Sequence, residues 1–488
     1  MSGASAKDAD SLAAYEAVIG LEVHVQLDTR SKLFCSCENR FGAEPNSLTC
    51  PVCLGHPGSL PVLNRDAVRS AVRVGLACGS EIALFTKFDR KNYYYPDLPK
   101  NYQISQYDLP IAAGGHVDLL HGGEAKRVGL VRIHLEEDAG KNIHSEDRPE
   151  SWIDLNRAGV PLLEIVTRPD IRSPEEAGAF LRALRLLMLY LEVSDCNMEQ
   201  GSLRCDSNVS VRPRGSESLE TRTEIKNLNS FAHVEAALRH EIRRQIRVRA
   251  EGRAVEQETR LYDPARDETR PMRGKEEAQD YRYFPEPDLP PLRLERAWVE
   301  SLRETLPELP LARRDRYVRS FGLSACHAEV LVRDRDLAAY FEACVRCHPE
   351  AREVANWVVN DVLQETNARG VSVAELGISP ERLAQLLRSV AGGKVSRQKA
   401  KDVFEAMIGN SESAESVIRS LGLEQVSDDA VLRAAVEEVI AENPRAVEAF
   451  RAGEKKSLNF LIGQTMRRTR GQGNPGVVAR IIQEILGA

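Results

Sequence analysis

The chain has 488 residues, of which 42% are hydrophobic and 28% are charged, as is typical of a globular protein with several domains. No apolar run approaches the roughly 18 residues needed to cross a bilayer, and the polar N-terminus does not look like a secretory signal. We therefore expect a cytoplasmic protein without membrane contacts. Ten cysteines in so long a chain do not suggest a secreted disulfide framework, and the net charge of −7 requires any nucleic-acid contact to come from a local basic patch.

Strand-like alternation of apolar and polar residues marks four segments in the first part of the chain. These segments are residues 19–27, 130–136, 203–209 and 222–226. Because successive side chains of a strand point to opposite faces, each segment would have an apolar back and a polar front. Antiparallel sheets with one solvated face have this pattern. We therefore predict such a sheet in the first part of the chain.

Four cysteines follow the first of these strands in two close pairs. Cys35 and Cys37 form a C-x-C pair, and Cys50 and Cys53 form a C-x-x-C pair. Two short loops spaced in this way can present four thiolates tetrahedrally to Zn²⁺. The alternative is a set of four ordinary thiols. We predict a structural zinc site, and because four sulfur ligands leave no open position for water, we assign it no catalytic role.

The polar fronts of the strands carry carboxylates, one imidazole and several cations. Hard oxygen ligands with an imidazole suit Mg²⁺ or Mn²⁺ beside a triphosphate, and nearby cations suit the phosphates. The acid and imidazole candidates are Glu22, His24, Glu136, Glu137, Glu199, Asp206 and Glu224. The phosphate-binding candidates are Arg90, Lys91, Arg204 and Lys226. No P-loop accompanies them. The residues alone thus indicate a zinc-stabilised protein that binds metal and phosphate, and they leave its reaction open.

Composition changes after a proline-rich stretch at residues 284–291, where regular structure should stop. Most of the later sequence has helical periodicity, with a second break near Gly392 and Gly393. We predict an α+β chain with an antiparallel-sheet domain over residues 1–293. An all-helical domain would follow over residues 294–407, and a small helical tail domain over residues 408–488.

A cluster of cations lies in the tail. Residues 451–470 contain six cationic residues and one acidic residue. Local positive charge on an acidic chain can bind an RNA backbone, although cations are also common at the solvated end of a helix. The residues alone leave both interpretations open: a nucleic-acid contact by Lys455, Lys456, Arg467, Arg468 and Arg470, or a solvated helix end.

Compared residue by residue, the same segments resemble the B subunit family of the aspartyl/glutamyl-tRNA(Asn/Gln) amidotransferases. The likeness covers nearly the whole chain. The matching strings include VIGLEVHVQL (18–27), KFDRKNYYYPDLPKNYQISQYD (87–108), HLEEDAGK (134–141), DLNRAGVPLLEIVTRPDIRSPEEA (154–177), MEQGSLRCDSNVSVRP (198–213), EIKNLNSF (224–231) and DYRYFPEPDLPPL (280–292).

The resemblance implies a ligase that phosphorylates the side-chain carboxylate of Glu-tRNA(Gln) or Asp-tRNA(Asn) with ATP and Mg²⁺. Ammonia from a glutaminase A subunit then displaces the phosphate, and a small C subunit completes a heterotrimer. The fold implied is a cradle domain, a helical domain and a tail that grips the tRNA. Carried onto this sequence, the resemblance makes Glu22, His24, Glu136 and Glu137 the metal-binding set. It places Glu199, Asp206 and Glu224 in the phosphate pocket.

Two other functions remain open at this point. One is a different ATP-dependent ligase or kinase that acts on a small carboxylic acid. The other is a zinc-bearing RNA-binding or assembly factor without enzymatic activity. No nucleophile motif for glutamine hydrolysis is recognisable in the sequence, so we expect that activity on a partner chain.

Overall fold

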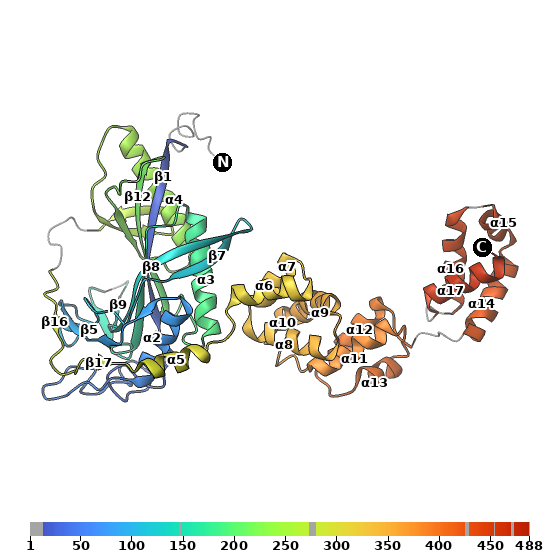
Figure 1. The fold of residues 1–488 in the computed structure, drawn as a ribbon, viewed down its shortest axis with the longest axis horizontal. Helices are drawn as coiled ribbons and strands as arrows, with labels where there is room; N and C mark the ends of the chain where they lie inside the picture. The colour runs from blue at the N-terminus through green and yellow to red at the C-terminus, as the bar shows by residue number, and fades with distance from the viewer. Residues whose placement is uncertain are drawn as a thin grey trace. The chain divides into compact units, whose positions relative to one another are not determined.

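The computed structural model describes residues 13–145, 148–272, 280–424, 429–452, 454–469 and 473–487 (Figure 1). The chain divides into two compact units, the first ending at Leu311 and the second beginning at Ala312. Strands dominate the first unit and helices make up the second, which confirms the predicted α+β class. Among the described residues, no helix combines the length and apolar composition that a membrane crossing requires.

A large sheet forms the body of the first unit. Its strands follow the order β15-β14-β13-β12-β1-β11-β8-β5-β4-β16, with β2, β6 and β7 attached beside this path. Among the described residues, the strands are β1 (Tyr15–Gln26), β2 (Glu81–Ile82), β3 (Phe85–Thr86), β4 (Asp89–Asn92), β5 (Tyr102–Ser105), β6 (Ala112–Ala113), β7 (His116–His121), β8 (Glu124–Glu137), β9 (Lys141–His144), β10 (Ser151–Asp154), β11 (Pro161–Thr167), β12 (Leu203–Pro213), β13 (Thr223–Lys226), β14 (Thr259–Asp263), β15 (Glu268–Pro271), β16 (Phe284–Pro285) and β17 (Leu292–Arg293).

The sheet is antiparallel, as predicted, except between β13 and β14, which run parallel. Parallel neighbours need a long crossover connection, and helix α4 (Phe231–Ala250) lies between these two strands in the chain. The predicted antiparallel arrangement is therefore confirmed for the other strand pairs and does not extend to this pair.

Strand β1 lies in the middle of the sheet, between β11 and β12. Its odd-numbered residues Ile19, Leu21, Val23 and Val25 are fully buried and form the apolar back of the strand. Helix α3 (Pro174–Tyr190) lies beside α4 and contributes Phe180 to the same hydrophobic core. The Ser173 hydroxyl accepts a hydrogen bond from the backbone N–H of Glu176 and so caps the N-terminus of α3.

Helices α2 (Arg65–Ala77) and α5 (Arg296–Glu304) also pack on the core of the first unit, where α5 buries Val299 and Leu302. The predicted boundary at residue 293 would instead assign α5 to the helical domain. The remaining helices are α6 (Pro310–Phe321), α7 (Ala325–Val332), α8 (Arg335–Cys347), α9 (Ala351–Trp357), the π-helix η1 (Val358–Val362), α10 (Leu363–Arg369), α11 (Pro380–Ala391), α12 (Arg397–Met407), α13 (Ala414–Ser420), α14 (Asp429–Glu442), α15 (Pro444–Arg451), α16 (Lys455–Arg468) and α17 (Pro475–Leu486).

Two separate hydrophobic cores occur among these later helices. The first extends from Tyr317 to Ile418 and includes side chains of α6 to α13. The second extends from Leu432 to Leu486 and joins α14 to α17. The predicted division into three domains, with a tail that begins at residue 408, stays a prediction.

Candidate functional site

Strand register brings acidic and imidazole side chains together on the polar face of the sheet. His24 of β1 lies opposite Glu164 of β11, which in turn lies opposite His134 of β8. The His24 Nε2 atom is 3.4 Å from Glu164 Oε2 and 3.9 Å from Glu136 Oε1. The His134 Nε2 atom is 3.5 Å from a Glu136 oxygen and 3.4 Å from a Glu164 oxygen. Three strands that are distant in sequence thus assemble one compact group.

His24, Glu136 and Glu164, called the His24 cluster from here on, have ligand atoms that all lie within 4.8 Å of one another. Burial alone would lower the pKa of His24, but the carboxylates of Glu164 and Glu136 raise it above its ordinary value. Burial opposes ionisation of Glu136, yet the neighbouring His134 and Lys91 hold its pKa below the usual range. Buried oxygens that stay charged beside an imidazole fit Mg²⁺ or Mn²⁺.

A second acidic group lies on the neighbouring strands of the same face. Glu22 of β1 is paired with Asp206 of β12, and Asn208 of β12 is paired with Glu224 of β13. The Lys226 ammonium lies between these acids, 3.0 Å from Asp206 Oδ2 and 3.2 Å from Glu224 Oε1. Burial raises the pKa of Glu22, and the charges of Glu164, Glu224 and Asp206 raise it further. Glu22 therefore belongs with this second group and is not a member of the His24 cluster.

Glu137 does not join either acidic group. It follows Glu136 on β8, and successive side chains of a strand point to opposite faces. Its carboxylate accepts hydrogen bonds from the Lys100 ammonium and from the backbone N–H of Ile104, the latter over 2.9 Å. The structure therefore separates Glu136 from Glu137, although the family resemblance implied one metal-binding set for both.

Glu164 was missing from the predicted set. It is the single charged residue in the apolar strand β11, whose sequence is PLLEIVT. When both faces of a strand are buried, a single carboxylate in that strand needs a charged or hydrogen-bonding partner. That signal was available in the sequence, and His134 was likewise on the predicted polar face but was not named as a candidate.

Most of the proposed phosphate-binding cations have protein partners. Arg90 forms a bidentate ion pair with Glu286, with nitrogen–oxygen distances of 2.7 and 2.9 Å. Arg204 Nη2 lies 2.8 Å from Asp138 Oδ2, and Lys226 is shared by two acids as described above. Within the described ranges, Lys91 has no such ion pair, and its charge acts on Glu136 and Glu164. The Lys91 ammonium also lies over the Tyr281 ring, 4.9 Å from the ring centroid.

A cavity of about 710 Å³ opens beside the second acidic group. Arg204 and Asp206 form part of its wall, so it is continuous with the polar face of the sheet. Glu199, the remaining acid of the predicted set, lines this cavity and is exposed to solvent. Glu199 is therefore separate from the buried acids of the sheet.

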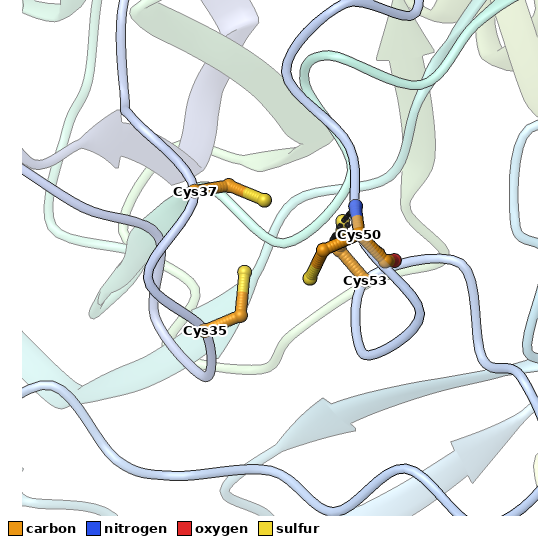
Figure 2. Close-up of side chains that lie close together, drawn as sticks. All are labelled: Cys35, Cys37, Cys50 and Cys53. Carbon is orange, nitrogen blue, oxygen red and sulfur yellow. Dashed lines mark hydrogen bonds between the residues drawn. The ribbon is translucent and has the colours of Figure 1, made fainter.

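The four predicted zinc ligands also come together (Figure 2). The Sγ atoms of Cys35, Cys37, Cys50 and Cys53 all lie within 4.8 Å of one another. A zinc ion with bonds of about 2.3 Å would need sulfur atoms about 3.8 Å apart, and Cys50 and Cys53 are 3.9 Å apart. A hydrogen bond from Cys35 lowers the pKa of Cys53, which favours a thiolate. The residues present fit a four-sulfur zinc site.

The predicted RNA-contacting residues lie in or just after helix α16. Lys456 and Arg467 are exposed to solvent, and they form no ion pair within the described ranges. Arg468 forms ion pairs with Glu438 and Glu442 of α14, at 2.6 and 2.9 Å. The Lys455 side chain and the whole of Arg470 lie outside the described residues.

Comparison with known proteins shows the family of the chain. Residues 17–300 match the GatB/GatE catalytic domain family, and residues 339–486 match the GatB domain family. The aspartyl/glutamyl-tRNA(Asn/Gln) amidotransferase B subunit of Carboxydothermus hydrogenoformans is 51% identical, over 97% of this chain and 99% of its own length. The protein of the same name from Nitratidesulfovibrio vulgaris is 53% identical, over 98% of this chain and 100% of its own length. The chain belongs to the family of aspartyl/glutamyl-tRNA(Asn/Gln) amidotransferase B subunits.

If the His24 cluster binds a divalent cation, replacing one of its carboxylates by an amide of nearly the same size should weaken metal binding. Glu164→Gln removes one negative charge, so we expect Mn²⁺ affinity to fall by about tenfold or more. Isothermal titration with Mn²⁺ measures this affinity. Glu300→Gln, an exposed change on α5, is the matched control and should bind Mn²⁺ like the unaltered chain. Equal affinity in both variants would contradict the assignment.

The cysteine geometry predicts about one zinc ion per chain. Cys53→Ser should abolish zinc binding and lower the melting temperature, because the metal ties two loops together. Metal analysis by mass spectrometry and thermal unfolding measure the two effects. Cys326→Ser, at an exposed cysteine outside the cluster, should change neither quantity. A zinc-free protein with four alkylatable thiols at positions 35, 37, 50 and 53 would rule the site out.

Proposed function

We propose that the chain uses ATP to activate the side-chain carboxylate of Glu-tRNA(Gln) and Asp-tRNA(Asn), which is then amidated to give Gln-tRNA(Gln) and Asn-tRNA(Asn). The observation that carries this proposal is the convergence of His24, Glu136 and Glu164 beside a second acidic group on one sheet face. As a family member, the chain is a subunit of a tRNA-dependent amidotransferase, a ligase of protein biosynthesis.

The reaction needs activation because a carboxylate is a poor acyl donor. Attack of a carboxylate oxygen on the γ-phosphorus of ATP forms an acyl phosphate and releases ADP. Ammonia then attacks the acyl carbon, the carbon–oxygen bond to phosphate breaks, and the amide and inorganic phosphate are formed. A divalent cation held by the His24 cluster would offset charge on the phosphate oxygens. Lys91 supplies further positive charge, and the site must keep water from the acyl phosphate.

Glu22, Asp206 and Glu224 form a second candidate cation site in this proposal. Lys226 now occupies the position between Asp206 and Glu224. Glu137, on the opposite face of β8, would make no direct contact with the metal. Arg90 and Arg204 would act as positioning residues, because each already forms an ion pair with a carboxylate. The four cysteines hold a structural zinc ion.

The proposal requires partner chains. Ammonia would come from glutamine hydrolysed by an amidase A subunit, and a small C subunit would complete the heterotrimer. The substrates are ATP and aminoacylated tRNA, which places the reaction in the cytoplasm. The cradle domain would hold the ATP site, and the helical tail would bind the tRNA. Which of the two amides a cell makes depends on its own set of tRNA synthetases.

One assay separates this function from the two alternatives. The chain and its A and C partners are mixed with ATP, Mg²⁺ and either misacylated tRNA or free glutamate, and ADP is measured. We expect ADP release only with misacylated tRNA, because that carboxylate alone is presented to the site. Release with free glutamate would instead favour a small-molecule ligase or kinase. No release under either condition would favour a non-enzymatic RNA-binding or assembly factor.

The tail prediction can be tested by charge reversal in α16. The double variant Lys456→Glu and Arg467→Glu should weaken tRNA binding. The plot of the logarithm of the binding constant against the logarithm of the salt concentration should also become less steep, by the amount expected for the loss of about two phosphate contacts. Filter binding at several stated salt concentrations measures both quantities. Arg480→Glu on α17, where Asp429 already neutralises the arginine, is the control and should retain nearly full affinity. Unchanged affinity in the α16 variant would refute tRNA contact by these residues.

A further inference from the structure

The four predicted zinc ligands, called the cysteine cluster from here on, share a small cavity with the end of strand β8. The cavity has a volume of about 60 Å³, and its wall includes Cys53, Lys100 and Glu137. Glu137 is the neighbour of Glu136 in β8 and lies on the opposite face of that strand. The cysteine cluster therefore lies close behind a residue that adjoins the His24 cluster.

The turn that presents Cys53 packs directly against Lys100. A hydrogen bond of 3.1 Å from the Gly55 N–H to the backbone oxygen of Val52 closes this turn (Figure 2). Gly55 has a φ angle of +67°, and a β-carbon at this position would collide with the side chain of Lys100. The position of Lys100 therefore depends on the path of the cysteine turn.

Lys100 in turn holds the carboxylate of Glu137. The two side chains form an ion pair, and both are nearly buried, with 9% and 3% of their surfaces exposed. The backbone N–H of Ile104 in β5 donates a hydrogen bond to the same carboxylate. The hydroxyl of Ser105, the next residue of β5, donates to Glu136 over 3.0 Å. Glu137 on one face of β8 and Glu136 on the other are thus fixed by one short segment of chain.

A second contact between the cysteine cluster and Glu137 occurs at Gly159. A β-carbon on Gly159 would lie 3.4 Å from Cys53 Cβ and 3.9 Å from Glu137 Oε2. The fully buried Lys32 lies beside this point, with Nζ 3.8 Å from Cys53 Sγ, and it forms no ion pair with a described carboxylate. A buried cation needs a compensating anion, and four thiolates around one Zn²⁺ carry two excess negative charges. The charge of Lys32 therefore fits the zinc-bound form of the cluster.

We infer that zinc binding at the cysteine cluster strengthens divalent-cation binding at the His24 cluster, with Lys100 as the positioning residue between them. This inference rests on the proposed function, which places a cation at the His24 cluster. Zinc ties the cysteine turns together, the turn after Cys53 supports Lys100, and Lys100 holds Glu137. The pleat of β8 then sets the position of the Glu136 carboxylate. By reciprocity, a cation at the His24 cluster strengthens zinc binding by the same factor.

Lys100→Met in the full chain tests the coupling without removing a ligand of either metal. Electrostatics alone predicts that loss of a positive charge strengthens cation binding. Positioning predicts the opposite, a fall in Mn²⁺ affinity of about tenfold. Isothermal titration with Mn²⁺ measures the affinity, and Glu164→Gln identifies the heat that belongs to the His24 cluster. Equal or higher Mn²⁺ affinity in Lys100→Met would overturn the inference.

Two further variants serve as controls for the Lys100 change. Lys100→Arg keeps a cation beside Glu137, so it should retain most of the Mn²⁺ affinity. Lys399→Met removes an exposed lysine whose ion pair with Asp402 lies within α12, and it should bind Mn²⁺ like the unaltered chain. A fall in affinity as large in Lys399→Met as in Lys100→Met would count against a specific role for Lys100.

Zinc removal gives a second test with a readout that does not depend on Mn²⁺. After treatment with a chelator and dialysis, amide hydrogen exchange should speed up in β5 and at the end of β8, while α3 keeps its protection. Unchanged exchange in β5 and β8 would refute the coupling. If α3 also loses protection, the protein has unfolded, and Lys100→Met decides instead. If the unaltered chain binds no Mn²⁺, the metal assignment of the proposed function has failed, and hydrogen exchange alone decides whether the cysteine turns support β8.

Discussion

The candidate site depends on the register between β1 and its two neighbours. His24 faces Glu164 on one side and Arg204 on the other, and a slip of one residue would turn every polar side chain of β1 into the core. The fully buried row that includes Leu21 and Val23 opposes such a slip. Hydrophobic packing on the back of the sheet therefore maintains the spacing of the charged atoms on the front.

The sequence allowed good prediction of what depends on local periodicity. Alternation predicted the polar side of β1 and β12, and paired cysteines predicted the four-sulfur group. Strand pairing depends on contacts between distant segments, so Glu164 could not be aligned with His24 from spacing alone. Glu136 and Glu137 point to opposite faces of β8. Which of the two reaches the polar face depends on how β8 pairs with its neighbours, and the sequence leaves that register open. The parallel pair of β13 and β14 follows from a crossover helix that local patterns do not orient.

The His24 cluster and the cysteine cluster differ in the ionisation of their side chains. In the His24 cluster, carboxylates stay ionised under nearly complete burial with imidazoles as neighbours. The cysteine cluster instead mixes thiol and thiolate: hydrogen bonding lowers the pKa of Cys53, while that of Cys37 is raised to about 11, mainly by burial. A zinc ion would remove the remaining protons. The first group thus suits an exchangeable hard cation, and the second suits a permanent soft one.

The ammonium of Lys226 has a consequence for folding. Glu22, Asp206 and Glu224 would repel one another if they were left without a counter-ion in the sheet. A single cation tethered to β13 pairs with two of these acids and offsets one unit of their negative charge within the chain itself. This tethered charge lowers the repulsion that the acid-rich strands must overcome when they pair before a mobile cation binds to them.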